Sequence, residues 1–419
     1  MTSPVWHPFT QHGLGEPIPR IDRAEGAALY TSDGRRIIDA ISSWWVTTHG
    51  HCNPRIMAAI ARQAQTLDQI IFAGFTHEPA ETLARALVDI LPDPLAHIFF
   101  SDSGSTSVEV ALKMALGYWR NRREPRHRIV VMEGSYHGDT FGGMSVGERG
   151  AYNRAYQRLL FDVARLPFPS PGAEQATLDA LDAICRNEAP AALIVEPLVL
   201  GAGGMLIYSA ETLSAMRELC ARHGVLFIAD EVMTGWGRTG TLLACERARV
   251  VPDILCLSKG LTGGAMPLAV TVATPAIYEA HRTTDRADML FHSSSYTANP
   301  IACAAGNANL AIWRDEPVLE RIGALAEAQQ ERLDRLSLQP GVRNPRRIGT
   351  IVAVDLNVDG SGYLSSSWPA LMTHFRERDL LVRPLGTTIY TMPPYCIDEQ
   401  DLDRLYLGIA EAIERFTTA

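Results

Sequence analysis

The 419-residue chain has no cysteine pattern that would build a structural metal site or a disulfide framework. Its seven cysteines are scattered and odd in number, and no two of them form a C-x-x-C pair. Zinc sites and small disulfide-rich domains depend on closely spaced, paired cysteines. We therefore expect reduced thiols, no metal site and a cytoplasmic location.

Long apolar runs and clusters of basic residues are also missing. No apolar stretch approaches the roughly 20 residues that span a bilayer, and the opening MTSPVWHPFTQHG lacks the basic and apolar regions of a signal peptide. The net charge of −9 and the lack of a basic stripe argue against nucleic acid as a partner. We expect small-molecule substrates, with no nucleic acid and no membrane as partner.

Short continuous apolar runs alternate with helical patterns through the middle of the chain. The runs lie at residues 97–104, 128–133, 191–197, 225–230 and 253–258. Continuous apolar residues are typical of strands that helices cover on both faces. Helical patterns at 107–119 and 210–224 lie between them, and Gly224 is placed to end the second. The sequence predicts an α/β fold with a mostly parallel sheet covered by helices.

One strand of this sheet is expected to run against its neighbour. The apolar run at 268–274 follows the run at 253–258 after a short glycine-rich turn. A crossover between parallel strands needs a dozen or more residues. We therefore predict that the strand at 268–274 is antiparallel to the one before it.

The two ends of the chain differ from the middle in pattern. Residues 28–42 indicate a hairpin around Asp33-Gly34. The tail indicates a helix at 318–336, strands at 348–356, 380–386 and 388–394, and a last helix from about Glu399. We predict a small α+β domain made by residues 1–50 and 311–419, and a large domain of residues 51–310.

Side chains suited to chemistry stand where several of the predicted strands end. They are, in chain order, Gly104, Ser105, Tyr136, His137, Asp139, Asp230 and Lys259. In open α/β sheets, ligands bind beyond the carboxyl ends of the strands. The apolar run before Lys259 should desolvate its ammonium group, lower its pKa and free the amine as a nucleophile.

This set of residues fits pyridoxal phosphate as a cofactor. Lys259 would attach the cofactor covalently, and Asp230 would stay ionised against the pyridine nitrogen. The helix start at 104–105 offers backbone N–H groups, a hydroxyl and a positive helix end to the phosphate. Tyr136 would lie flat on the ring, with Val232 as a candidate for its other face. Each residue alone has a plain structural explanation, but their occurrence at successive strand ends favours the cofactor.

Motifs over nearly the whole chain resemble those of the class III aminotransferases of PLP fold type I. The general ones are LIVEP at 193–197, LFIADEVMTGWGRTG at 226–240 and PDILCLSKGLTGG at 252–264. Others resemble the members that convert 8-amino-7-oxononanoate to 7,8-diaminononanoate in biotin biosynthesis, with S-adenosylmethionine as amino donor. These motifs are VWHPFTQ at 5–11, DAISSWWVTTHGH at 39–51, YHGDTFGGMSVG at 136–147 and RPLGTTIYTMPP at 383–394.

The resemblance implies a homodimer with shared active sites, and it assigns a role to each site residue. The catalytic residues would be Lys259 and Asp230. The contacts to pyridoxal phosphate would be Gly104, Ser105, Tyr136, Asp230, Lys259, Ser294 and Ser295. The contacts to the substrates would be Phe9, Trp44, Trp45, Tyr136, Asp139, Lys259, Ser293, Arg383 and Tyr390. The family has a glycine-proline-threonine turn that reaches the cofactor phosphate of the other subunit, and here that turn is 293–295, Ser-Ser-Ser.

The tandem tryptophans Trp44-Trp45 and the charge of Asp139 favour S-adenosylmethionine as donor, because aromatic faces attract a sulfonium. Two adjacent tryptophans cannot both face one core from a strand, so at least one should lie outside the core. Arg383 can bind a carboxylate with two hydrogen bonds. Members that use S-adenosylmethionine usually have tyrosine where this chain has Phe9.

Three alternatives stay open at this point. Lysine could be the donor to the same acceptor, since members that use it also read PFTQ. The chain could be a general ω-amino acid or diamine transaminase, although the tandem tryptophans argue against it. A nucleotide-binding α/β module without a covalent cofactor would need a G-x-G-x-x-G motif, and SDSGSTS is not one.

Overall fold

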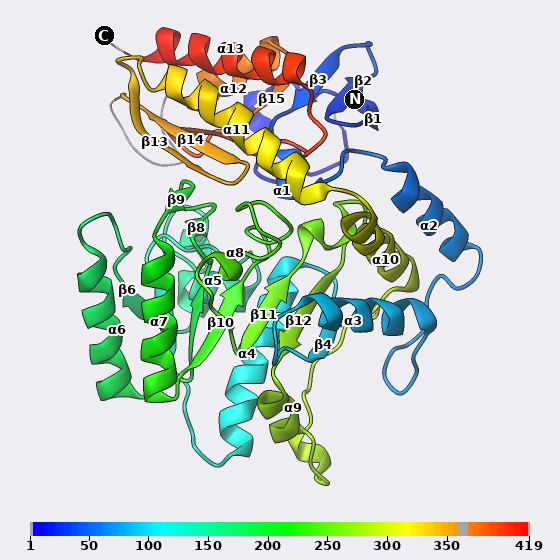
Figure 1. The fold of residues 1–419 in the computed structure, drawn as a ribbon, viewed down its shortest axis with the longest axis vertical. Coiled ribbons are helices and arrows are strands. Elements are labelled where there is room, and N and C mark those ends of the chain that lie inside the picture. The colour runs from blue at the N-terminus through cyan, green and yellow to red at the C-terminus, as the bar shows by residue number, and fades with distance from the viewer. Residues whose placement is uncertain (1–2, 359–367, 418–419) are drawn as a thin grey trace.

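The computed structural model describes residues 3–358 and 368–417, and a seven-stranded sheet lies at its centre (Figure 1). Its strands are β4 (His97–Ser101), β5 (Ile129–Met132), β6 (Ala164–Leu166), β7 (Ala192–Val195), β10 (Leu226–Asp230), β11 (Ile254–Leu257) and β12 (Ala269–Ala273). They lie in the order β4-β12-β11-β10-β7-β5-β6. β12 is antiparallel to both β11 and β4, whereas the other neighbouring pairs are parallel. The antiparallel strand predicted from the short turn is confirmed.

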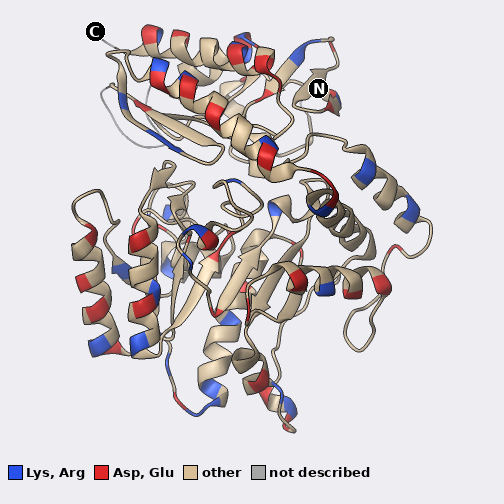
Figure 2. Cartoon of the chain, viewed as in Figure 1, with Lys and Arg blue, Asp and Glu red and all other residues tan. Residues whose placement is uncertain are grey.

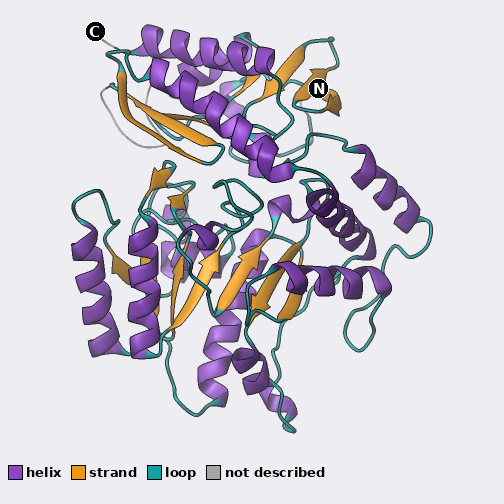
Figure 3. Cartoon of the chain, in the orientation of Figure 1, coloured by secondary structure: helices purple, strands orange, loops and turns teal. Residues whose placement is uncertain are grey.

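Helices cover both faces of this sheet, as Figure 3 shows. In β7, Ala192 and Ile194 belong to the core under α4 (Gly104–Asn121), whereas Leu193 and Val195 belong to the core under α6 (Glu174–Glu188) and α7 (Ala210–His223). Gly224 ends α7 in a left-handed conformation, with φ 61°, as its position predicts. Because both faces are buried, the central strands are apolar throughout rather than at alternate positions.

Strands from the two ends of the chain share one sheet. β1 (Ile21–Glu25), β2 (Ala28–Thr31), β3 (Arg36–Asp39) and β15 (Leu380–Leu381) lie in that order. β2 and β3 form the hairpin predicted around Asp33-Gly34, and β15 pairs in parallel with β3. The beginning and the tail of the chain therefore lie side by side above the central sheet (Figure 1). The proposed boundaries at residues 50 and 310 stay a prediction.

The tail adds a second small sheet and three helices. The sheet is β13 (Val342–Ile348), β14 (Ile351–Leu356) and β16 (Thr388–Thr391), and the helices are α11 (Val318–Leu336), α12 (Trp368–Glu377) and α13 (Glu399–Phe416). The predicted helix at 318–336 and the last helix are confirmed. The strand predicted at 380–386 is wrong beyond Leu381, because Pro384 has no N–H to donate and the chain turns back through a bridge between Leu385 and Thr388.

The remaining elements connect these layers. The helices are α1 (Ser42–Trp45), α2 (Pro54–Ala64), α3 (Glu78–Ile90), α5 (Phe141–Val146), α8 (Ala244–Arg247), α9 (Pro275–His281) and α10 (Pro300–Asp315), with 3-10 turns η1 (His12–Leu14), η2 (Arg154–Leu159), η3 (Lys259–Thr262) and η4 (Arg286–Asp288). β8 (Val199–Leu200) and β9 (Leu206–Ile207) form a two-stranded sheet.

Charges of both signs are interspersed on the outer helices, for example on α6, α11 and α13 (Figure 2). Within the residues that the structure describes, no helix is long and apolar enough to cross a membrane. The same residues contain no group of three His, Cys, Asp or Glu side chains that could hold a metal ion.

Candidate active site

Two cavities meet at Lys259, which opens η3 directly after β11. The inner cavity has a volume of about 150 Å³ and the outer one about 430 Å³. Both are lined by Trp45, Tyr136 and Lys259. Lys259 has φ 48°, an unusual conformation for a residue with a side chain. Strained backbone of this kind is found more often at functional sites than elsewhere.

Burial lowers the pKa of Lys259 from its usual 10.5 to about 8. The negative charges of Asp230 and Glu196 oppose this shift but do not cancel it. The Nζ atom lies 4.7 Å from the centre of the Trp45 ring. The lowered pKa that the apolar strand predicts is therefore confirmed, and an appreciable fraction of the side chain is the uncharged amine near neutral pH.

Asp230 ends β10 at the floor of the inner cavity. One carboxylate oxygen lies 2.7 Å from His137 Nδ1, and the other accepts a hydrogen bond from the Val232 N–H at 3.1 Å. The remaining ring nitrogen of His137 is buried and has no hydrogen-bond partner. The loop after β5, through His137, and the loop after β10, through Val232, thus fix the orientation of this carboxylate. The sequence motifs assign His137 no role, although it follows Tyr136 directly.

The start of α4 forms another wall of the inner cavity. The Ser103 and Thr106 side chains make a capping box there, which fixes the first helical turn. The loop that carries Tyr136 crosses this turn closely, since a Cβ atom on Gly138 would lie 2.1 Å from the Ser105 hydroxyl. Gly138 also has φ 109°, which favours glycine. The first amide groups of α4 therefore face a pocket that suits an anion.

Glu196 is a second buried acid beside the inner cavity. Its two carboxylate oxygens each accept a backbone hydrogen bond of 2.9 Å, one from Tyr136 and one from Gly201. Burial raises the pKa of Glu196 to about 7, although the charge of His137 and both hydrogen bonds oppose the shift. This residue fixes the Tyr136 loop. Its position in the LIVEP motif is the only sign of it in the sequence.

The tandem tryptophans lie in the irregular helix α1 and not in a strand. Trp44 is 42% exposed, whereas Trp45 is 5% exposed and donates a hydrogen bond of 2.9 Å to the Tyr390 hydroxyl. The Asp39 carboxylate accepts hydrogen bonds from the backbone of Ile41 and Ser43, which turns the chain sharply. The expectation that one tryptophan lies outside the core is confirmed.

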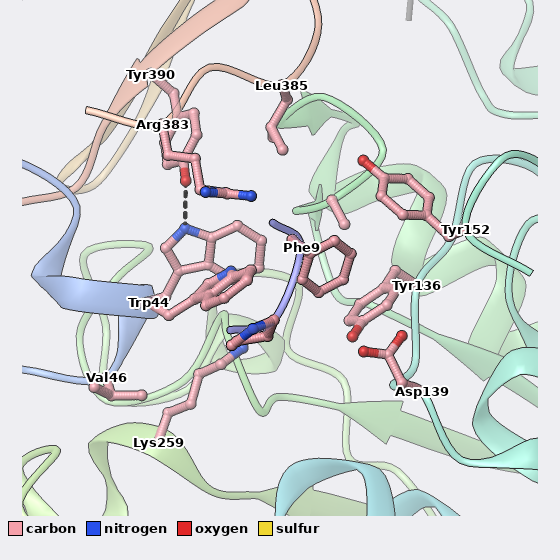
Figure 4. A pocket seen from close by; sticks show the side chains of 13 residues that line it. Phe9, Trp44, Val46, Tyr136, Asp139, Tyr152, Lys259, Arg383, Leu385 and Tyr390 are labelled. Carbon is pink, nitrogen blue, oxygen red and sulfur yellow. Dashed lines mark hydrogen bonds between the residues drawn. The ribbon is translucent and has the colours of Figure 1, made fainter. Parts of the chain in front are cut away.

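Six of the thirteen residues that line the outer cavity are aromatic (Figure 4). The Arg383 guanidinium carbon lies 5.3 Å from the centre of the Trp44 ring and 6.0 Å from that of Phe9. On the opposite wall, the Tyr136 hydroxyl points toward the Asp139 carboxylate. Burial first, and then the charge of Asp139, raise the pKa of Tyr136. The cavity thus has a cation at one side and an anion at the other.

The structure brings most of the predicted site residues together. Gly104, Ser105, Tyr136, Asp230 and Lys259 line the inner cavity, and Phe9, Trp44, Trp45, Tyr136, Asp139, Lys259, Arg383 and Tyr390 line the outer one. Their roles as ligand contacts stay predictions. Ser293, Ser294 and Ser295 line neither cavity. Ser294 donates to an Asp102 carboxylate oxygen, and the Ser295 carbonyl accepts from Gln69 at 2.6 Å.

Comparisons with known proteins agree with this geometry. The model of the class III aminotransferases matches residues 11–413. The chain is 46% identical over 418 residues to the adenosylmethionine-8-amino-7-oxononanoate aminotransferase of Synechococcus elongatus, covering 98% of each protein.

Two solved structures extend the comparison. The chain matches the crystal structure of adenosylmethionine-8-amino-7-oxononanoate aminotransferase from Methanocaldococcus jannaschii with a TM-score of 0.94 and 31% identity, covering 99% of this chain and 98% of the other. It also matches an amine transaminase from an uncultivated Pseudomonas species, in its PLP-bound form, with a TM-score of 0.92 and 31% identity over 99% of each chain. The chain belongs to the class III aminotransferases.

Proposed function

We propose that this chain transfers an amino group from S-adenosylmethionine to 8-amino-7-oxononanoate, giving 7,8-diaminononanoate, with pyridoxal phosphate as cofactor. This is a step of biotin biosynthesis. The observation that carries the proposal is the desolvated amine of Lys259 at the junction of a polar inner cavity and an aromatic outer cavity. The names of the relatives from Synechococcus and Methanocaldococcus support this acceptor and this donor.

The groups around the inner cavity fit pyridoxal phosphate. The first amides of α4 and the Ser105 hydroxyl would hold the phosphate. Asp230, oriented by His137 at 2.7 Å, would hold the protonated pyridine nitrogen. Tyr136 and Val232 also line this cavity and would cover the two faces of the ring. When bound, the cofactor supplies an electrophilic carbon and a ring that withdraws electrons from an attached amine.

Lys259 has two tasks in this proposal. Its uncharged amine holds the cofactor covalently in the resting enzyme. Once a substrate amine has displaced it, Nζ would carry a proton between the reacting carbon of the substrate and the C4′ carbon of the cofactor, in one direction in the first half of the cycle and in the other direction in the second half. A pKa of about 8 suits both tasks, because the amine can be protonated and deprotonated near neutral pH.

The outer cavity would bind the two substrates in turn. Trp44 and Trp45 offer flat faces to the alkyl chain of the acceptor and to the sulfonium of the donor. Arg383 would bind the distal carboxylate of the acceptor with paired hydrogen bonds. Asp139 adds negative charge that favours a cationic donor.

The chain offers a matched pair of variants to test this proposal, because it contains two lysines, Lys113 and Lys259. We expect Lys259→Ala to fold but to lose transamination by at least about a thousandfold, since it lacks the nucleophile and proton carrier. Lys113→Ala should keep its activity. The assay follows 7,8-diaminononanoate formed from both substrates. A Lys259→Ala protein with near wild-type turnover would overturn the assignment.

A half-reaction screen tests the donor. Purified holoenzyme is mixed separately with S-adenosylmethionine and with lysine, and the visible band of the lysine-bound cofactor is followed. We expect S-adenosylmethionine to bleach the band. Bleaching by lysine alone would replace the donor and leave the acceptor in place. Bleaching by many ω-amino acids would favour a general transaminase.

A homodimer and a cytoplasmic location belong to the same proposal. The hydroxyls at Ser294 and Ser295 would complete the phosphate site of a partner subunit, which is consistent with their position outside both cavities of their own chain. Sedimentation at the assay concentration tests this. A monomer with full activity would contradict the shared site.

A further inference from the structure

Three aromatic side chains form a row along the outer cavity, and one of them, Tyr152, comes from a loop outside the recognised motifs. The centre of the Phe9 ring lies 5.5 Å from that of Trp44 and 6.0 Å from that of Tyr152. All three rings line the cavity, and each keeps between 42% and 45% of its surface exposed. Half-exposed aromatic rings that converge on one cavity are typical of a site for a flat or apolar ligand.

The loop that carries Tyr152 is held in place by its neighbour Asn153. Asn153 is 4% exposed, and its side-chain nitrogen donates a hydrogen bond of 2.6 Å to the Glu148 carbonyl. The Glu148 N–H in turn donates to the Ser135 carbonyl at 2.7 Å, next to Tyr136. Tyr152 is therefore placed relative to the inner cavity by a chain of hydrogen bonds.

Tyr152 lies at the end of the cavity away from Lys259. A substrate with its reacting carbon at Lys259 would place its other end beside Tyr152. Lys259 marks the reacting end, and Figure 4 shows Phe9, Tyr152 and Arg383 around the other end. The acceptor carries a carboxylate at its far end, which suits Arg383. The donor carries adenine there, whose flat faces and polar edge suit an aromatic pair with a hydroxyl.

Phe9 offers this end of the cavity a ring face without a hydroxyl. The Tyr152 hydroxyl points away from Tyr136 and toward Leu385, at the same end of the cavity as Phe9 (Figure 4). The ring of Tyr152 meets Phe9 at 71°, so the two rings form a corner rather than a stack. A flat base could therefore lie on one ring while its edge meets the other.

We propose that Tyr152 is a specificity-determining residue for the amino donor. With Phe9 it binds the adenine of S-adenosylmethionine, and its hydroxyl forms a hydrogen bond with the polar edge of the base. This inference rests on the proposed function of the same site. It implies that Tyr152 contributes to the donor half-reaction and little to the acceptor half-reaction, because the acceptor has no flat base.

Tyr156 provides a matched control. It lies four residues later, is 47% exposed, and meets Phe141 edge-on with 6.3 Å between ring centres, but it does not line the outer cavity. The experiment compares the holoenzymes of wild type, Tyr152→Ala, Tyr152→Phe and Tyr156→Ala. The second-order rate constant is measured for each half-reaction, and the binding of adenosine is measured by calorimetry.

We expect Tyr152→Ala to slow the reaction with S-adenosylmethionine about tenfold and to weaken adenosine binding by a similar factor. Tyr152→Phe keeps the ring and should lose about fivefold, the effect of one neutral hydrogen bond. The reaction with 8-amino-7-oxononanoate should change less than about twofold in both variants. Tyr156→Ala should match wild type throughout.

Three results would overturn the inference. Equal losses in the two half-reactions would mean that Tyr152 shapes the cavity in general. Unchanged adenosine binding in Tyr152→Ala would mean that the base lies elsewhere. A wild-type enzyme that reacts with lysine and not with S-adenosylmethionine is a different outcome, because it overturns the proposed donor itself and this inference with it.

Discussion

The rate at which the cofactor-free protein takes up pyridoxal phosphate should rise with pH around a midpoint near 8. The uncharged amine of Lys259 is the group that attacks the cofactor, and burial lowers its pKa to about 8. With this pKa, the uncharged fraction rises from roughly a tenth at pH 7 to roughly nine tenths at pH 9. The uptake rate should therefore rise about tenfold over these two pH units.

The assay mixes cofactor-free protein with pyridoxal phosphate and follows the visible band of the covalent product. Borohydride reduction and mass spectrometry then locate the attachment. Lys113→Arg leaves Lys259 as the single lysine of the chain, and this variant should give the same pH profile. Together with the site located by mass spectrometry, this control assigns the titrating amine to Lys259.

A second variant tests the electrostatic cause. The charge of Glu196 raises the pKa of Lys259 and so opposes the effect of burial. Glu196→Gln removes that charge, and the midpoint should move to lower pH. A rate that stays constant between pH 7 and pH 9, or that has its midpoint near 10, would refute the argument that the strand end desolvates this lysine.

Three further changes should affect the cofactor site in different ways. Asp230→Asn should weaken cofactor retention by about 2 kcal/mol, the value of a hydrogen bond to a charged group, and slow turnover, which dialysis and steady-state kinetics measure. Gly138→Ala should lower the free energy of unfolding by about 2 kcal/mol, measured by thermal unfolding, because φ is 109° and the added Cβ meets the Ser105 hydroxyl. Gly172→Ala is the control and should lower it by less, because Gly172 also has a positive φ but its added Cβ meets open space. Ser295→Ala should lower cofactor affinity modestly in the dimer, and unchanged affinity would remove this residue from the phosphate site.

The central sheet could be predicted because the apolar pattern that produces it can be read directly along the sequence. Strands covered on both faces are apolar throughout, so β7, β10 and β11 stand out from their surroundings. The direction of β12 follows from the length of the turn before it. Both features depend on residues that are close together in the chain.

The features that the sequence does not indicate are those that depend on contacts with another segment of the chain. β13 is largely exposed and polar, and it becomes a strand because it pairs with β14. His137 and Glu196 belong to the site through contacts with Asp230, across 93 residues, and with Tyr136, across 60 residues. Their residue types are visible in the sequence, but the neighbours that give them a role are not.

Phe9 illustrates both what the sequence indicates and what only the folded chain shows. Its ring belongs to the motif PFTQ, but its φ of 49° and its contacts with Trp44 and Tyr152 appear only in the folded chain. A bulky residue in this conformation costs about 1 kcal/mol or more, so other contacts must hold it there. The two rings, and the Arg383 guanidinium carbon 6.0 Å from the centre of the Phe9 ring, are among these contacts. A donor whose adenine fills the corner between Phe9 and Tyr152 would add to them. Donor binding and this conformation of Phe9 should therefore stabilise each other, because both depend on the same ring.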